Sequence, residues 1–174
     1  IFPKEKAASY RVHSSARGLR QRAVTLAGLG LVVLAVGVHG AMRDPVVREQ
    51  PLPIAGLTKE LSGLRIAMLA DVHIGAGLDG DWLRRVVEAT NAQHPDAVVI
   101  VGDVADGTVE RLYDEIKCLG DLKAPYGVFL VAGNHEYYSG YQEWMAAFKR
   151  MGLTVLTNEH RVLQIRGAKL VLAG

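Results

Sequence analysis

Three short polar clusters, each directly after an apolar run, contain the residue types that bind metal ions. The clusters are Asp71-Val72-His73, Gly102-Asp103-Val104-Ala105-Asp106 and Gly133-Asn134-His135-Glu136. Carboxylate, amide oxygen and imidazole together suit borderline or hard divalent cations such as Mn²⁺, Fe or Zn²⁺. The sequence therefore predicts a metal site, with ligands from Asp71, His73, Asp103 and Asn134.

The spacing within these clusters favours two ions over one. Asp71 and His73 stand two residues apart, so an extended backbone places both side chains on the same side, where they can hold one ion. Asp103 has two carboxylate oxygens and can bridge two cations about 3.5–4 Å apart, a separation that suits phosphate displacement. Gly102, just before it, allows a close approach of the backbone. We expect two divalent metal ions and a hydrolytic reaction at a phosphate.

His135 is the predicted catalytic residue. It follows Asn134 directly and is expected to stabilise the phosphoryl transition state and to protonate the leaving oxygen. The attacking group is expected to be water activated by the cations, so no Ser or Cys nucleophile is required. Asp106 is expected to hold a ligand by a hydrogen bond or to cap the following helix. Gly102 and Glu136 are expected to support the ligands without binding the metal themselves.

Three apolar runs must position these clusters. They are Leu64–Ala70, Ala97–Val101 and Val128–Ala132. Short runs without polar alternation are typical of strands that are covered on both faces. Sites in open α/β sheets form beyond the carboxyl ends of the strands, so the three clusters are expected to converge there.

Apolar residues at helical spacing separate the strands. The predicted helices are Trp82–Gln93, a helix after a capping Thr108 that extends to Leu119, and Tyr141–Met151. A short run at Leu153–Leu156 follows. Glu159–Gln164 and Lys169–Ala173, joined by Arg166-Gly167, predict a hairpin that starts a second sheet. The pattern as a whole predicts an α/β sandwich.

Residues 23–42 contain no Lys, Arg, Asp or Glu and have the length of a helix that crosses a hydrocarbon core of about 30 Å. A transmembrane anchor is the first interpretation; a cleaved signal peptide and a buried core helix are the alternatives. Residues 1–22 carry six Lys/Arg against Glu5 alone, which places them in the cytoplasm and the catalytic domain outside it. Residues 43–56 contain three prolines and predict a linker, and the domain is expected from residue 57 to 174.

The remaining composition excludes some partners. Residues 43–174 carry fourteen Lys/Arg against seventeen Asp/Glu, without a basic stripe, so nucleic acid is not an expected partner. The single cysteine, Cys118, excludes an internal disulfide and lies on an apolar helical stripe. The chain begins at Ile1 instead of Met and stops after the apolar run that ends at Ala173, so we expect an N-terminal fragment of a longer protein.

The three clusters resemble the metallophosphoesterase (calcineurin-like) superfamily, whose signature is DxH, GDxxD, GNH[DE], a single His and GHxH. Four segments are similar to those of the bacterial membrane-associated YkuE-like phosphohydrolases. They are LADVHIG, PDAVVIVGDVADG, APYGVFLVAGNHEYYSG and LTVLTNE. The resemblance covers residues 62–174. It implies the first half of an α/β/β/α sandwich, preceded by one transmembrane helix.

The resemblance also implies roles for individual residues. Asp71, His73 and Asp103 would serve the first metal, Asp103 and Asn134 the second, and His135 would be catalytic. The later His and the GHxH block have no match, and His160 comes too early, inside the predicted hairpin. The chain as given is therefore expected to bind metal weakly and to turn over little.

The function expected of the longer protein is metal-dependent hydrolysis of a phosphate ester or pyrophosphate at a membrane. The substrate is expected to be a phosphate-containing small molecule or a lipid-linked phosphate, and a nucleotide would use the same metal site. The alternative is a non-catalytic, membrane-tethered binding module that keeps the fold without the reaction.

Overall fold

The computed structural model describes residues 15–75 and 77–174 of the chain. The chain divides into two compact units, residues 1–43 and residues 44–174. Residues 1–14, which form most of the predicted basic segment, lie outside the described residues.

The first unit contains one long helix, α1 (Ala16–Ala41), in which no side chain of the described residues is buried. The helix begins earlier than the apolar stretch that starts at residue 23. Ser15 caps it by accepting a hydrogen bond from the Gly18 N–H at 3.2 Å, and the Arg and Gln side chains before Ala23 favour helix as well. Its 26 residues extend about 39 Å, so by length and composition α1 is able to span a membrane.

The second unit is built on a parallel sheet with the strand order β1-β2-β3-β4. The strands are β1 (Ile66–Leu69), β2 (Ala97–Val101), β3 (Val128–Val131) and β4 (Thr154–Val155). Leu69 pairs with Ile100, and Val101 pairs with Val131, so the strands end at one edge of the sheet. This arrangement confirms the predicted strands and places the three polar clusters at the same edge.

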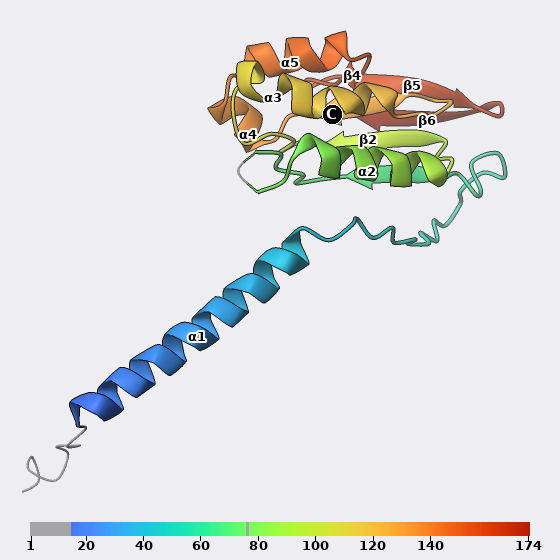
Figure 1. The fold of residues 1–174 in the computed structure, drawn as a ribbon. Helices are drawn as coiled ribbons and strands as arrows, with labels where there is room; N and C mark the ends of the chain where they lie inside the picture. Colours follow the sequence, from blue (N-terminus) through green and yellow to red (C-terminus); the bar gives the residue numbers. More distant parts are fainter. Residues whose placement is uncertain (1–14, 76) are drawn as a thin grey trace, which may run out of the picture. The chain divides into compact units, whose positions relative to one another are not determined.

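Helices cover one face of this sheet (Figure 1). They are α2 (Gly80–Ala92), α3 (Val109–Ile116) with the 3₁₀ helix η2 (Lys117–Asp121), and α5 (Tyr141–Arg150). Their apolar side chains pack on the strands in one core, which includes Leu83, Val86, Ile116, Trp144 and Phe148 from the helices and Val98, Ile100 and Leu130 from the strands. The α2 helix begins two residues before the predicted start because Asp79 caps it, accepting a hydrogen bond from the Trp82 N–H at 2.9 Å. Thr108 occupies the N-cap of α3, although its side chain forms no capping hydrogen bond within the described residues.

The opposite face of the sheet carries the hairpin of β5 (His160–Ile165) and β6 (Ala168–Ala173), which confirms the predicted hairpin. Its turn residues Arg166 and Gly167 both have positive φ, 51° and 91°, as tight hairpin turns require. Gly174 follows β6 and lies so close to Val131 that a Cβ there would be 2.4 Å from Val131 Cγ1. Leu130 faces the helices and Val131 the other side, so the hairpin begins a further layer.

The expectation that the strands are covered on both faces is wrong for β1. Ile66 and Met68 in β1 are 47% and 70% exposed, and Val101 at the end of β2 is 46% exposed. The hairpin covers the β3 and β4 side of this face, where Phe129 and Leu156 are buried. Sequence pattern therefore described the apolar character of β1 correctly but not its exposure in this chain.

Candidate metal centre and active site

Backbone hydrogen bonds hold the first two polar clusters side by side beyond the ends of β1 and β2. The N–H groups of His73 and Ile74 donate to the carbonyl oxygens of Asp103 and Val104, each at 2.9 Å. The Asp106 N–H donates in turn to the Ile74 carbonyl at 2.8 Å. The two loops thus continue the parallel pairing of the sheet, which fixes their side chains relative to each other.

Apolar residues within the same loops anchor them in the core. Val72, Ile74, Val104 and Ala105 are all buried, and each lies beside a polar residue of the clusters. The polar neighbours Asp71, His73, Asp103 and Asp106 are half-buried or exposed. The same short sequences therefore supply both the anchor and the site.

Three of the polar residues have a left-handed backbone. The φ angles are 52° at Asp71, 52° at His73 and 51° at Asp103. Such conformations are uncommon for residues other than glycine, although Asp and His adopt them more readily than most, and they cost roughly 1–3 kcal/mol each. The expectation of an extended backbone at Asp71 and His73 is therefore wrong, because the chain bends at both residues.

Glu136 joins the second and third clusters. Its side chain is fully buried. Its carboxylate accepts backbone N–H groups from Asp103 at 3.0 Å, from Val104 at 2.8 Å and from Gly133 at 2.7 Å. Three N–H donors offset the loss of water around this buried carboxylate. Glu136 therefore fixes the loop of Asp103 against the start of helix α4 (Asn134–Tyr138).

Two glycines make this close approach possible. A Cβ at Gly102 would lie 2.2 Å from the Gly133 nitrogen, and Gly102 also has a positive φ of 65°. A Cβ at Gly133 would lie 2.2 Å from Asp103 Oδ1. Both positions exclude any larger residue, which explains the glycine in each of the two motifs.

Asp106 contacts both histidines of the site through one oxygen. Its Oδ1 lies 2.8 Å from His73 Nδ1 and 2.6 Å from His135 Nδ1. The two imidazole rings meet edge to face with their centroids 4.5 Å apart. Since Nδ1 of each ring faces Asp106, Nε2 of each ring is left for other partners. The sequence-based expectation that Asp106 holds a ligand by a hydrogen bond matches this arrangement.

The electrostatic surroundings of His73 are negative. The hydrogen bond to Asp106 raises the pKa of His73 above its ordinary value, and the charges of Asp106, Asp103 and Asp71 act in the same direction, while burial opposes them. A metal cation bound to His73 in place of the proton would be attracted by the same negative charges.

His73, Asp103 and His135 form a group that fits a metal ion. One ligand atom from each lies within 4.8 Å of the others. His73 Nε2 and Asp103 Oδ2 are 3.9 Å apart, and two ligands that each lie about 2.0–2.2 Å from one ion can be separated by up to about 4.2 Å. Asp103 Oδ1 accepts the His135 N–H at 2.9 Å, so Oδ2 is the oxygen that faces His73. Two imidazoles and a carboxylate indicate a divalent cation.

The other predicted ligands lie beside this group. Asp71 is exposed directly after β1, and its charge acts on His73, although its carboxylate does not join the described His73–Asp103–His135 group. Asn134 begins α4 and is exposed next to His135. The structure thus places His135, predicted as the catalytic residue, in one group with His73 and Asp103.

A supporting residue that the sequence did not reveal is Trp144. It is fully buried in α5, and its indole N–H donates to the Gly107 carbonyl at 2.9 Å, next to Asp106. A Trp needs a partner for its N–H when buried, but no local signal in the sequence pointed to Gly107.

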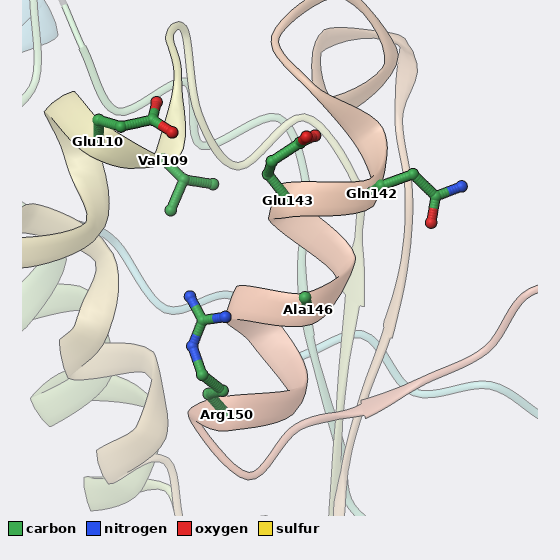
Figure 2. Close-up of a pocket in the computed structure, with 6 residues that line it drawn as sticks. All are labelled: Val109, Glu110, Gln142, Glu143, Ala146 and Arg150. Carbon is green, nitrogen blue, oxygen red and sulfur yellow. The ribbon is translucent and has the colours of Figure 1, made fainter.

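A separate open groove of about 380 Å³ runs between α3 and α5 (Figure 2). It is lined by Val109, Glu110, Gln142, Glu143, Ala146 and Arg150. None of the residues of the His73–Asp103–His135 group lines this groove.

This geometry agrees with the family to which the chain belongs. Residues 64–172 match the Calcineurin-like phosphoesterase family, and the chain is a member of it, which confirms the resemblance that the motifs indicated. The matched residues include all three polar clusters and the His73–Asp103–His135 group, which suggests divalent metal binding.

The relatives come from bacteria and animals. A Danio rerio transmembrane protein with metallophosphoesterase domain is 38% identical over 141 residues, which cover 80% of this chain and 32% of that protein. A Campylobacter jejuni metallophosphoesterase is 36% identical over 138 residues, covering 76% of this chain and 36% of that protein. The Bacillus subtilis metallophosphoesterase YkuE is 30% identical over 118 residues, covering 64% of this chain and 40% of that protein. The chain spans about a third of the length of the curated relatives it matches.

Proposed function

We propose that the protein hydrolyses a phosphate ester or a pyrophosphate with two divalent metal ions, Mn²⁺, Fe or Zn²⁺, and does so at a membrane. The observation that carries this proposal is the convergence of His73, Asp103 and His135 within 4.8 Å beside the shared carboxylate of Asp106. Membership of the Calcineurin-like phosphoesterase family supports the reaction type.

The residues of this chain divide the work. Asp71, His73, Asp103 and Asn134 would hold the cations, which when bound supply positive charge to the phosphate oxygens and lower the pKa of bound water. His135 gives a proton from Nε2 to the leaving oxygen, because Asp106 occupies its Nδ1 at 2.6 Å. Glu136 accepts the N–H groups of Asp103 and Gly133 and so holds the Asp103 loop against the start of α4, which carries His135.

Membrane attachment would be through residues 23–42, which include α1 up to Ala41 and its C-cap Met42. The helix is long and apolar enough to span a bilayer. Basic residues precede the apolar stretch 23–42, Arg17, Arg20 and Arg22 in the first turns of α1 among them, which favours a cytoplasmic N-terminus and an extracytoplasmic catalytic domain. The substrate would then be a phosphate-containing small molecule or a lipid-linked phosphate of the cell envelope.

The direct test is hydrolysis of bis-p-nitrophenyl phosphate with added Mn²⁺, using the 174-residue chain and the full open reading frame in parallel. We expect activity that chelators abolish in the longer form and little or none in the shorter form, because the later His and GHxH ligands have no match in these residues. Strong activity of the 174-residue chain would contradict the account of missing ligands.

Metal content distinguishes the enzyme from a non-catalytic, membrane-tethered binding module. Two ions per full-length protein, measured by mass spectrometry of the purified protein, support the enzyme, and none supports the module.

An alkaline phosphatase reporter fused after residue 174 tests the orientation of the catalytic domain, since alkaline phosphatase is active only outside the cytoplasm. A signal from a cytoplasmic reporter at that position would refute the proposed topology.

A further inference from the structure

Two exposed tyrosines follow the histidine of the third cluster on α4. Tyr137 and Tyr138 are 62% and 78% exposed. The ring of Tyr137 stacks on Tyr141, with centroids 4.5 Å apart and planes 12° apart. The ring of Tyr138 instead lies against His135, with centroids 5.9 Å apart and planes tilted by 60°. Tyr138 therefore presents a large aromatic surface directly beside the proposed proton donor.

The orientation of His135 determines what lies near that surface. Its Nδ1 is held by Asp106, so Nε2 is on the far side of the ring from this carboxylate. A leaving oxygen that receives a proton from Nε2 must approach within about 2.6–3.2 Å of it. The ring centroids of His135 and Tyr138 are only 5.9 Å apart, so a ring-sized group on that oxygen is long enough to reach the Tyr138 ring.

The Tyr138 side chain has no evident structural task in the domain. Among residues 15–75 and 77–174, no hydrogen bond holds its hydroxyl, and the ring adds little to the core because most of it is exposed. An aromatic face with a polar tip at the mouth of a site is suited to stack on a flat group of a ligand. Similar aromatic faces bind bases in proteins by stacking, with little dependence on the identity of the base.

We propose that Tyr138 forms one wall of a leaving-group subsite and that this subsite prefers a flat aromatic or heteroaromatic group over a small alkyl group. This inference rests on the proposed function for the role of His135. It narrows the substrate class to phosphate esters whose leaving group carries a ring at or near the ester oxygen.

The test measures binding without turnover. Benzylphosphonate and ethylphosphonate replace the leaving oxygen by a methylene group, so neither is hydrolysed, and they differ in the ring. Titration calorimetry with the full-length protein and Mn²⁺ should show tighter binding of benzylphosphonate, by about 5- to 10-fold for one stacking contact. Tyr138→Ala should abolish this preference, while Tyr138→Phe should retain it, because the ring and not the hydroxyl makes the contact.

Tyr137→Ala is the matched control. It removes an exposed ring of the same type from the neighbouring position, but that ring stacks on Tyr141, so the preference for benzylphosphonate should remain. Equal binding of the two compounds to the wild type, the absence of binding by both, or a preference that survives Tyr138→Ala would each overturn the proposed subsite. A protein that shows the preference but does not hydrolyse bis-p-nitrophenyl phosphate would refute the proposed reaction and leave the subsite standing.

Discussion

The Oδ1 atom of Asp106 lies 2.6 Å from Nδ1 of His135. The same oxygen lies 2.8 Å from Nδ1 of His73, so one carboxylate sets the tautomer and the orientation of both imidazoles. A carboxylate in this position also limits rotation of each ring. The site is therefore organised around a residue that is not itself expected to touch the metal.

Replacing Asp106 by Asn should weaken metal binding by about 10- to 100-fold, because His73 loses its charged partner and both rings become free to rotate. Mn²⁺ titration followed by electron paramagnetic resonance measures this change. Asp114→Asn is the control, since Asp114 is an exposed carboxylate paired with Lys117 on α3. Unchanged Mn²⁺ affinity in Asp106→Asn would show that the contact is not functional.

Substitutions of His73 and His135 should separate binding from turnover. His73→Ala should lower the affinity for Mn²⁺, because it removes a proposed ligand. His135→Ala should lower kcat by about 10²- to 10⁴-fold, as expected for a lost general acid, with a smaller change in Mn²⁺ affinity. Kinetics with bis-p-nitrophenyl phosphate at saturating Mn²⁺ check both statements in the full-length protein. A loss of Mn²⁺ binding in His135→Ala as large as in His73→Ala would reassign His135 as a ligand.

Glu136→Gln should destabilise the fold by about 2–4 kcal/mol. The amide group of Gln offers an N–H where the carboxylate accepts one, so at least one of the backbone donors from Asp103, Val104 and Gly133 is left unpaired in a buried position. Urea unfolding of the chain in detergent, followed by Trp fluorescence, measures the loss. Glu143→Gln, an exposed change on α5, should alter the free energy of unfolding by less than about 0.5 kcal/mol.

Gly102→Ala should damage the site more than its small size suggests. The new methyl group would meet the backbone of Gly133. The alanine would also have to keep the positive φ of this position. We expect both lower stability and lower Mn²⁺ affinity, measured by the same titration and unfolding experiments. Gly77→Ala is the control, since nothing lies within 4 Å of the position of its Cβ; an equal loss there would rule out the steric explanation.

Cys118 should be an inert thiol in the native state. Burial raises the pKa of the Cys118 thiol above its ordinary value, so the neutral form is favoured at neutral pH and the reactive thiolate forms only at more alkaline pH than for a free cysteine. Reaction with Ellman's reagent at pH 8 should be slow in the native chain and complete in guanidinium chloride. Rapid native reaction would show that η2 opens readily around Cys118.

The fold and the site differ in how far the sequence could predict them. Apolar runs at Ala97–Val101 and Val128–Ala132 predicted strands because burial demands continuous apolar sequence there, and parallel strands bring their carboxyl ends to one edge. The convergence of His73 and Asp103 follows from that rule. The exposure of Ile66 and Met68 could not be predicted, since sequence pattern records apolar character but not which layer covers a face.

The hydrogen bonds that support the site residues were less predictable from the sequence. Asp106 was expected to hold a ligand by a hydrogen bond or to cap the following helix, but nothing in the sequence showed that its Oδ1 contacts both His73 and His135. Glu136 was expected to support the ligands, yet its three backbone partners depend on loop geometry that only coordinates give. The contact between Trp144 and Gly107 joins positions far apart in sequence, where local periodicity carries no information.

The shared oxygen of Asp106 also makes the two histidines energetically interdependent. A change at either ring alters the hydrogen bond that remains for the other, so the effects of single substitutions at His73 and His135 should not sum to the effect of the double substitution. Drift at one of these positions would thus change the selective constraint on the other, and the pair should evolve as a unit.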